Sequence, residues 1–287
     1  MSINALPRIS QTSVPLTHPL EATDERGHRV VVQIPAERSL TLYVDRVEVV
    51  TLMTLGAHPE WLVLGYLLNQ NLVASVHDIE AITVDWEVGA AAVSTHSKGF
   101  NAQGRPAAKT VTTGCGQGSM YSDLIDTLKP IGDLPQAIAQ QTLLAIVDRV
   151  RQQETLYKRA GSVHACALFE GAELRVFIED VGRHNALDSI AGWRALQAPG
   201  FITTHPILYT TGRLTSEMII KAAQMQVPVV ISRSGTTEMA VDVAQRYRVC
   251  TIGRALNRRF LCYTHPWRIE FSAEPQTPAS PSLESLR

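Results

Sequence analysis

Short runs of β-branched and apolar residues, separated by polar turns, dominate the first third of the chain. These runs predict strands, and the clearest lie at 29–35 (RVVVQIP), 39–44 (SLTLYV), 47–54 (VEVVTLMT), 79–86 (IEAITVDW) and 90–95 (AAAVST). A helix is expected over 59–70, because the apolar positions follow a helical period and Pro59 suits a first turn. This order of elements predicts a β-rich N-terminal part.

The pattern changes after residue 131, where apolar strands alternate with amphipathic helices. A long helix is predicted over 134–154, because Asp133 can cap it and Gln136 stands at the reciprocal capping position. Further helices are expected over 184–197, 214–226 and 236–247, between strands at 163–169, 174–180, 206–210, 227–232 and 249–253. Such alternation is typical of an α/β layer.

The two ends of the chain differ in composition from the rest. Residues 1–28 are polar and without period, and residues 271–287 are rich in proline and serine, so both are predicted to be disordered. Between them we predict two parts. The β-rich part covers 29–130 and ends in a loop that contains Cys115, and the α/β domain covers 131–270.

Composition excludes several classes of protein. Of the 287 residues, 45% are hydrophobic, which suffices for a substantial core, and a net charge of −1 gives no basic surface for general nucleic-acid binding. No apolar run approaches the roughly 20 residues of a membrane span, and no secretory signal is apparent, so a cytoplasmic protein is expected. The four cysteines form no CxxC pair, which favours reduced thiols over a disulfide framework or a thiolate metal site.

One cysteine stands out by its neighbours. Cys115 lies in TGCGQGS (113–119), at the end of a long stretch without strand or helix period and before a predicted helix at 120–128. The glycines leave little side-chain volume around the sulfur, and amide groups at a helix start favour a thiolate. Cys115 is therefore either a presented nucleophile or a small structural residue.

Three segments place polar groups where a strand meets a helix. The first, EDVGRHNALD (179–188), carries Arg183 and His184 at the carboxyl end of a strand, where open α/β sheets bind ligands. YTTGRLTSEM (209–218) and VVISRSGTTEMA (229–240) combine free amides, hydroxyls and guanidinium groups, a set that suits an anion. Their candidates are Gly212, Arg213, Ser234 and Gly235. A capped helix with a solvated face and two ordinary turns remain the alternatives.

The last basic segment is GRALNRRFLCYTHPWRI (253–269). Arg254, Arg258 and Arg259 concentrate positive charge beside a short strand. Bidentate contacts to phosphate are the strongest use of such a cluster, and a solvated basic edge is the alternative.

These blocks, together with GSVHACAL (161–168), resemble the signature blocks of the formate dehydrogenase accessory sulfurtransferase family (FdhD), over roughly residues 30–270. The resemblance implies a carrier that takes sulfur from a cysteine desulfurase as a persulfide on a loop cysteine. It implies transfer to the bis-guanine-dinucleotide molybdenum cofactor before that cofactor enters formate dehydrogenase. It further implies a larger domain similar to cytidine deaminase without the zinc site, and a homodimer.

The resemblance assigns roles to particular residues. The family's loop reads Gly-Cys-Gly-x-Cys-Gly; Cys115 matches the first cysteine, and Gly118 replaces the second. We therefore expect Cys115 to carry the sulfur without a two-cysteine relay. The family's cofactor-binding stretch falls on Arg254, Ala255, Leu256, Asn257, Arg258 and Arg259, and Arg183, His184, Gly212, Arg213, Ser234 and Gly235 are further candidates for the same pocket.

Two other functions are compatible with parts of this pattern. A non-catalytic chaperone for the molybdenum dinucleotide would leave Cys115 idle, and Gly118 favours it. A nucleotide deaminase or other hydrolase is disfavoured, because neither an H-x-E nor a PCxxC motif is present to hold zinc. No metal site is expected from the sequence.

Overall fold

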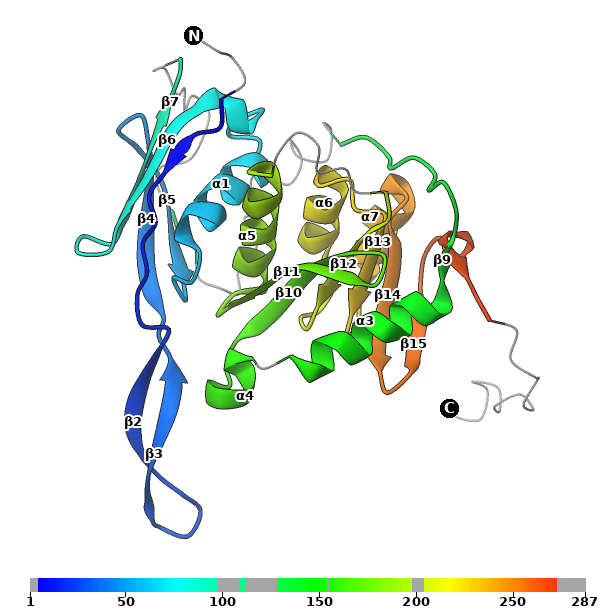
Figure 1. The fold of residues 1–287 in the computed structure, drawn as a ribbon, viewed down its shortest axis with the longest axis horizontal. Helices are drawn as coiled ribbons and strands as arrows, with labels where there is room; N and C mark the ends of the chain where they lie inside the picture. Colours follow the sequence, from blue (N-terminus) through cyan, green and yellow to red (C-terminus); the bar gives the residue numbers. More distant parts are fainter. Residues whose placement is uncertain (1–4, 98–108, 112–127, 154, 198–203, 273–287) are drawn as a thin grey trace.

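The computed structural model describes residues 5–97, 109–111, 128–153, 155–197 and 204–272 (Figure 1). Cys115 and Gly118 lie outside the described residues, as does nearly all of the helix predicted over 120–128. The described residues form two large sheets with helices between and around them.

The first sheet is built from the N-terminal part. Its described strands run in the order β1 (Arg8–Ile9), β6 (Ile79–Asp85), β7 (Ala90–Thr95), β4 (Arg38–Val44), β5 (Val47–Thr54) and β8 (Lys109–Val111). A 3-10 turn (Val76–Asp78) with a Ser75–Asp78 capping box precedes β6. A separate hairpin of β2 (Thr17–Thr23) and β3 (Arg29–Pro35) extends away from the body of the molecule.

The second sheet follows the predicted α/β pattern. Its order is β11 (Glu173–Asp180), β10 (His164–Glu170), β12 (Pro206–Thr210), β13 (Val229–Ser232), β14 (Cys250–Leu256) and β15 (Arg259–Cys262). Helix α3 (Gln140–Gln152) covers one face, and α5 (Arg183–Ala195), α6 (Ser216–Gln224) and α7 (Glu238–Tyr247) cover the other (Figure 1). The α/β class with three layers is thus confirmed.

Alternation along β10 explains why both faces of this sheet are covered. Cys166 and Leu168 belong to the core beneath α5, α6 and α7, whereas Ala167 and Phe169 belong to the core beneath α3. All four are fully buried. Successive side chains of a strand point to opposite faces, so a continuous apolar run requires cover on both sides.

Helix α1 (Pro59–Asn69) joins the two halves. It packs on the first sheet and on α5, and its side chains are buried nearly all round, as expected for a helix without a polar face. Gly65 and Gly192 let the two helix backbones meet. A Cβ atom on Gly65 would lie 1.7 Å from the carbonyl oxygen of Asp188, and one on Gly192 would lie 1.9 Å from that of Trp61.

The predicted start of the long helix is wrong. The helix expected over 134–154 begins only at Gln140, because Ile138–Ala139 forms strand β9, which pairs with β16 (Ile269–Glu270). Asp133 does not cap that helix; its carboxylate instead accepts a hydrogen bond from Arg248. Burying Ile138 against the core outweighs the local capping signal.

The prediction of disorder over 1–28 is also wrong for the described residues 5–28. β1 pairs with β6, and β2 pairs with β3 along its whole length. Glu60, in the first turn of α1, accepts hydrogen bonds from the Ser10 hydroxyl and from the amide and hydroxyl of Thr12. These are long-range contacts, which the low hydrophobicity of the segment does not indicate.

Candidate functional site

The carboxyl ends of several strands meet at one edge of the second sheet. β12, β13 and β14 run parallel, β11 ends beside them, and β10 begins at this edge. A cavity of about 550 Å³ lies between this edge and the helices α3 and α4 (Leu156–Ala160). Open α/β sheets bind ligands in this position, so we refer to it as the carboxyl-edge cavity.

Some of the predicted residues line this cavity, and others do not. Ser234, Ala255, Leu256 and Asn257 contribute to its wall. The remaining candidates are not part of the lining: Arg254, Arg258, Arg259, Arg183, His184, Gly212, Arg213 and Gly235.

The hairpin between β14 and β15 brings its lining residues into place. Arg254, Asn257 and Arg258 adopt positive φ angles of 53°, 50° and 63°, which turn the chain sharply. The amide of Arg254 donates to the carbonyl oxygen of Ser234 at 2.7 Å, which ties the hairpin to the loop after β13. Ser234 and Asn257 therefore reach the same cavity from neighbouring strands.

Several lining residues were not predicted from the sequence. The charged ones are Asp148 and Arg151 of α3, Lys158 of α4, Glu179 at the end of β11, and Arg233. Arg233 supplies the guanidinium group of the segment 229–240, which the sequence pattern already indicated for an anion, but it was not named among the candidates. The residues of α3 and α4 belong to no sequence motif. Only the packing of these helices brings them to the sheet edge, so no local signal pointed to them.

The charges around the cavity are partly compensated. Glu179 accepts the amides of Leu156 at 2.6 Å and of Tyr157 at 3.1 Å, at the start of α4. Arg151 lies 3.4 Å from Asp148. Arg233 is exposed, and no described acidic group pairs with it. The wall thus offers a guanidinium group to an anionic ligand.

Behind this edge lies a group of basic side chains, His164, Arg183 and Arg213. Burial lowers the pKa of the His164 imidazole, and the nearby Arg183 and Arg213 lower it further. Burial, followed by the charge of Arg213, likewise lowers the pKa of Arg183. Gly212 lets the Arg183 side chain pass, because a Cβ there would lie 2.7 Å from the Arg183 Cδ. His164 is the member of this group that reaches the cavity wall.

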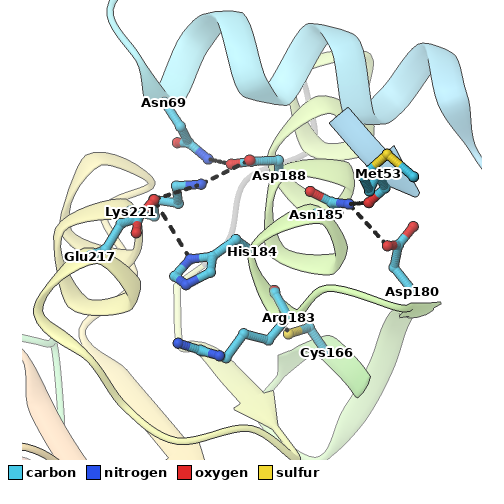
Figure 2. A network of polar contacts seen from close by, with 10 residues as sticks. All are labelled: Met53, Asn69, Cys166, Asp180, Arg183, His184, Asn185, Asp188, Glu217 and Lys221. Atoms are coloured by element: carbon cyan, nitrogen blue, oxygen red, sulfur yellow. Dashed lines mark hydrogen bonds and ion pairs between the residues drawn. The ribbon is translucent and has the colours of Figure 1, made fainter. Parts of the chain in front are cut away.

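His184 points into a buried polar network rather than into the cavity (Figure 2). Its Nδ1 lies 3.7 Å from a carboxylate oxygen of Glu217. Burial, followed by the charge of Lys221, lowers the pKa of His184 to about 2, so the imidazole is neutral. It cannot serve as a base for a ligand in the carboxyl-edge cavity from this position.

The centre of this network is an ion pair between two helices. Lys221 Nζ of α6 lies 2.8 Å from Asp188 Oδ2 of α5, and both side chains are almost fully buried. Asn69, at the end of α1, donates to the other oxygen of Asp188 at 2.7 Å. Burial lowers the pKa of Lys221, but Asp188 and Glu217 raise it by more, so the ammonium stays charged.

Asp180 connects the two sheets at the same edge. Its buried carboxylate accepts hydrogen bonds from the Thr54 hydroxyl at 2.5 Å and from the Leu55 amide at 3.2 Å. The Gly182 amide and the Asn185 side chain donate to the other oxygen, each at 3.0 Å. Burial raises the pKa of Asp180 to about 6, although these four donors act in the opposite direction.

This raised pKa predicts a pH-dependent stability. The folded-state pKa exceeds the value of roughly 3.9 in an unfolded chain, so the contribution of Asp180 is fully present below pH 4 and is lost as the pH rises through 6. Between pH 4 and pH 6 we expect the free energy of unfolding of the wild type, minus that of Asp180→Asn, to fall by about 3 kcal/mol. Urea unfolding of both proteins from pH 4 to 7.5 measures it. A constant difference would contradict the prediction.

Cys166 is a structural thiol. It is completely buried, its Sγ donates to the Thr210 hydroxyl at 3.3 Å, and burial raises its pKa to about 12. Within the described ranges, no three His, Cys, Asp or Glu side chains are placed to hold a metal ion. No described helix is long and apolar enough to cross a membrane.

Comparison with known proteins agrees with this architecture. Residues 35–270 match the sequence model of the FdhD/NarQ family. The chain belongs to this family. Among its relatives, the "Sulfur carrier protein FdhD" of Bacillus pumilus is 32% identical over 241 residues, which cover 83% of this chain and 90% of that protein. Its namesake in Bacillus subtilis is 30% identical, covering 84% and 90%.

A similar fold is found in a solved structure. A crystal structure described as a formate dehydrogenase accessory protein from Desulfotalea psychrophila matches with a TM-score of 0.72. The match covers 89% of this chain and all of that chain, at 22% sequence identity. The likeness thus extends over most of the fold described above.

Proposed function

We propose that this protein is a sulfur carrier that serves the maturation of formate dehydrogenase. Cys115 accepts sulfur from a cysteine desulfurase as a persulfide, and the carboxyl-edge cavity binds the guanine-dinucleotide molybdenum cofactor that receives this sulfur. The observation that carries the proposal is the cavity itself. Three residues that the family resemblance assigns to the cofactor, the run 255–257, line one cavity together with Ser234, a candidate from its place at a strand end, at the ligand-binding edge of the sheet.

The lining suits a guanine nucleotide. Arg233 offers a guanidinium group to phosphate, and the Asn257 amide and the Ser234 hydroxyl can donate and accept hydrogen bonds. Tyr157 and Tyr209 add aromatic surface to the same wall. A volume of about 550 Å³ lies within the usual range of roughly 300 to 1,000 Å³ for small-molecule sites. It matches one nucleotide arm of the cofactor better than the whole molecule.

The sulfur step needs only the Cys115 thiolate on this chain. The thiolate attacks the outer sulfur of the desulfurase persulfide, the sulfur–sulfur bond breaks, and the desulfurase thiolate leaves. The sulfur then passes to the molybdenum cofactor, which is the cargo. The proposal further includes a homodimer in the cytoplasm that meets the catalytic subunit of formate dehydrogenase. Sequence similarity to relatives named as sulfur carriers supports the carrier role itself.

Gly118 stands where the family has its second loop cysteine, and this supports the alternative function of a non-catalytic chaperone. A protein without the second loop cysteine could bind the molybdenum dinucleotide and present it without handling sulfur. Loading of Cys115 separates the two functions, because a chaperone binds the nucleotide but gains no sulfur.

We expect Cys115→Ala to abolish lasting sulfur acceptance and to leave nucleotide affinity within about twofold of the wild type, since the nucleotide contacts lie elsewhere. The protein is incubated with a cysteine desulfurase and cysteine, and intact-mass spectrometry with peptide mapping locates any gain of about 32 Da. Titration with GDP measures the affinity.

The matched variant is Arg233→Ala, which should show the reverse result. It should load Cys115 normally and bind GDP roughly 10- to 100-fold more weakly, as expected when a charge-assisted contact to phosphate is lost. Unchanged sulfur loading in Cys115→Ala would refute the carrier function. If the wild-type protein gains no sulfur on Cys115 while it binds GDP, the chaperone function replaces it.

A further inference from the structure

Two thiols of the second sheet lie in contact, away from the carboxyl-edge cavity. The sulfur atoms of Cys250 and Cys262 are 3.7 Å apart on the neighbouring strands β14 and β15. Cys250 begins β14, five residues before Ala255 of the cavity wall, and Cys262 pairs with Ile252, three residues before it. The two thiols therefore lie roughly 10 to 16 Å from that wall along the strands. The sulfurs need to approach by less than 2 Å to reach the roughly 2.05 Å of a disulfide.

The two thiols differ in exposure and in pKa, as the attacking thiol and the resolving thiol of a sulfur-transfer pair do. Cys262 is partly exposed on the last strand of the sheet, whereas Cys250 is fully buried beneath it. The hydrogen bond from Cys250 lowers the pKa of Cys262, and the same contact together with burial raises the pKa of Cys250. Deprotonation of the pair therefore begins at the accessible sulfur.

A buried cation accompanies the pair. Arg268 is 2% exposed and donates through Nη2 to the carbonyl oxygens of Ile131 and Gly132. Its Nε and Nη1 are buried and have no hydrogen-bond partner among the described residues. The charge of this guanidinium lowers the pKa of Cys250. Unsatisfied buried donors are costly in a folded protein, and an anionic sulfur nearby would use their charge.

From this geometry we infer that Cys250 and Cys262 form a second sulfur site, which accepts sulfane sulfur from a persulfide and releases it as hydrosulfide. The Cys262 thiolate attacks the outer sulfur of a persulfide; the donor's sulfur–sulfur bond breaks, and the donor thiolate leaves. Cys262 then carries the sulfur as its own persulfide.

The buried thiol completes the reaction. Cys250 loses its proton and attacks the inner sulfur of the Cys262 persulfide, that sulfur–sulfur bond breaks, and hydrosulfide leaves. A Cys250–Cys262 disulfide remains. The two thiols lose two electrons and the sulfane sulfur gains them, so the persulfide is the only oxidant required. The inference rests on the proposed function only in taking a persulfide as the donor.

The test uses the full chain carrying Cys115→Ala, so that loop chemistry cannot contribute, with glutathione persulfide as the probe. We expect release of about one hydrosulfide per chain above the protein-free control, and a mass lower by about 2 Da. Peptide mapping should find residues 250 and 262 linked. Adding Cys250→Ala should leave a stable gain of about 32 Da on Cys262 and reduce sulfide release at least about tenfold.

Cys166→Ala is the matched control, because it removes a buried thiol from the opposite face of the same sheet. It should leave the hydrosulfide release and the Cys250–Cys262 disulfide unchanged. Cys262→Ala should abolish both the disulfide and the bound sulfur. Circular dichroism confirms that each variant is folded, and alanine keeps these sites small and apolar. Undiminished sulfide release from folded Cys262→Ala protein would overturn the inference, as would an unreactive Cys115→Ala protein. If the desulfurase fails to load Cys115 in the wild type while the pair still reacts, the proposed function fails and this inference stands.

Discussion

Replacing Gly65 by alanine is expected to destabilise the protein by about 3 kcal/mol or more. The added Cβ would lie 1.7 Å from the Asp188 carbonyl oxygen, a backbone atom that cannot rotate away. Helices α1 and α5 would have to separate, and their separation would loosen the packing of α1 on the first sheet and of α5 on the second. Urea unfolding followed by circular dichroism measures the loss.

Two other glycines make this test specific. Gly132→Ala adds the same methyl group in open space and should change stability by no more than about 0.5 kcal/mol. Gly192→Ala should cost about as much as Gly65→Ala, because its Cβ would lie 1.9 Å from the Trp61 carbonyl oxygen. The double variant should cost clearly less than the sum, since one methyl group already separates the helices. Wild-type stability of Gly65→Ala would contradict the predicted contact.

Lys221→Met is expected to cost about 3 to 5 kcal/mol, the effect of removing one partner from a buried ion pair. Methionine fills much of the space of lysine, so the loss reflects charge rather than volume. Asp188 would remain buried at 2% exposure, with the Asn69 amide still donating to one of its oxygens. Chemical unfolding at pH 7 provides the measurement.

A second substitution separates charge from packing. Adding Asp188→Asn to Lys221→Met removes the stranded carboxylate and should recover at least half of the loss. Arg8→Met, which breaks the exposed pair with Glu80, should change stability by less than about 1 kcal/mol. A double variant that is less stable than Lys221→Met alone would mean that Asp188 is held by its other contacts, and the argument from pairing would fail.

Helices and strands that can be recognised from the pattern of their own side chains were predicted correctly from the sequence. The helix expected over 59–70 is α1 to within one residue, and the alternating strands after 163 form one sheet. The errors occur where long-range contacts dominate. Ile138 looks like part of a helix, but its backbone pairs with Ile269 and its side chain fills the core. β1 and β2 have weak patterns because partner strands, rather than their own hydrophobicity, hold them.

The candidate site was predictable where strand ends supply it. Ser234 lies just after β13, and the rule that ligands bind at carboxyl ends leads to it, whereas Asn257 was predicted from the family resemblance. The same rule favoured His184, which does not line this cavity. A residue at a helix start can face either the cavity or the neighbouring helix, and here Glu217 lies beside His184. Lys158 was missed, since no local pattern shows that α4 would pack over the sheet edge.

The position of α1 has a consequence for the order of folding during synthesis. Its first face can settle on strands that leave the ribosome at about the same time, but its second face must wait for α5, which begins more than 110 residues later. At roughly 5 to 20 residues per second, that interval lasts on the order of 5 to 25 seconds. During this time an apolar helix surface, with Gly65 at its centre, is exposed and is a natural substrate for a general chaperone.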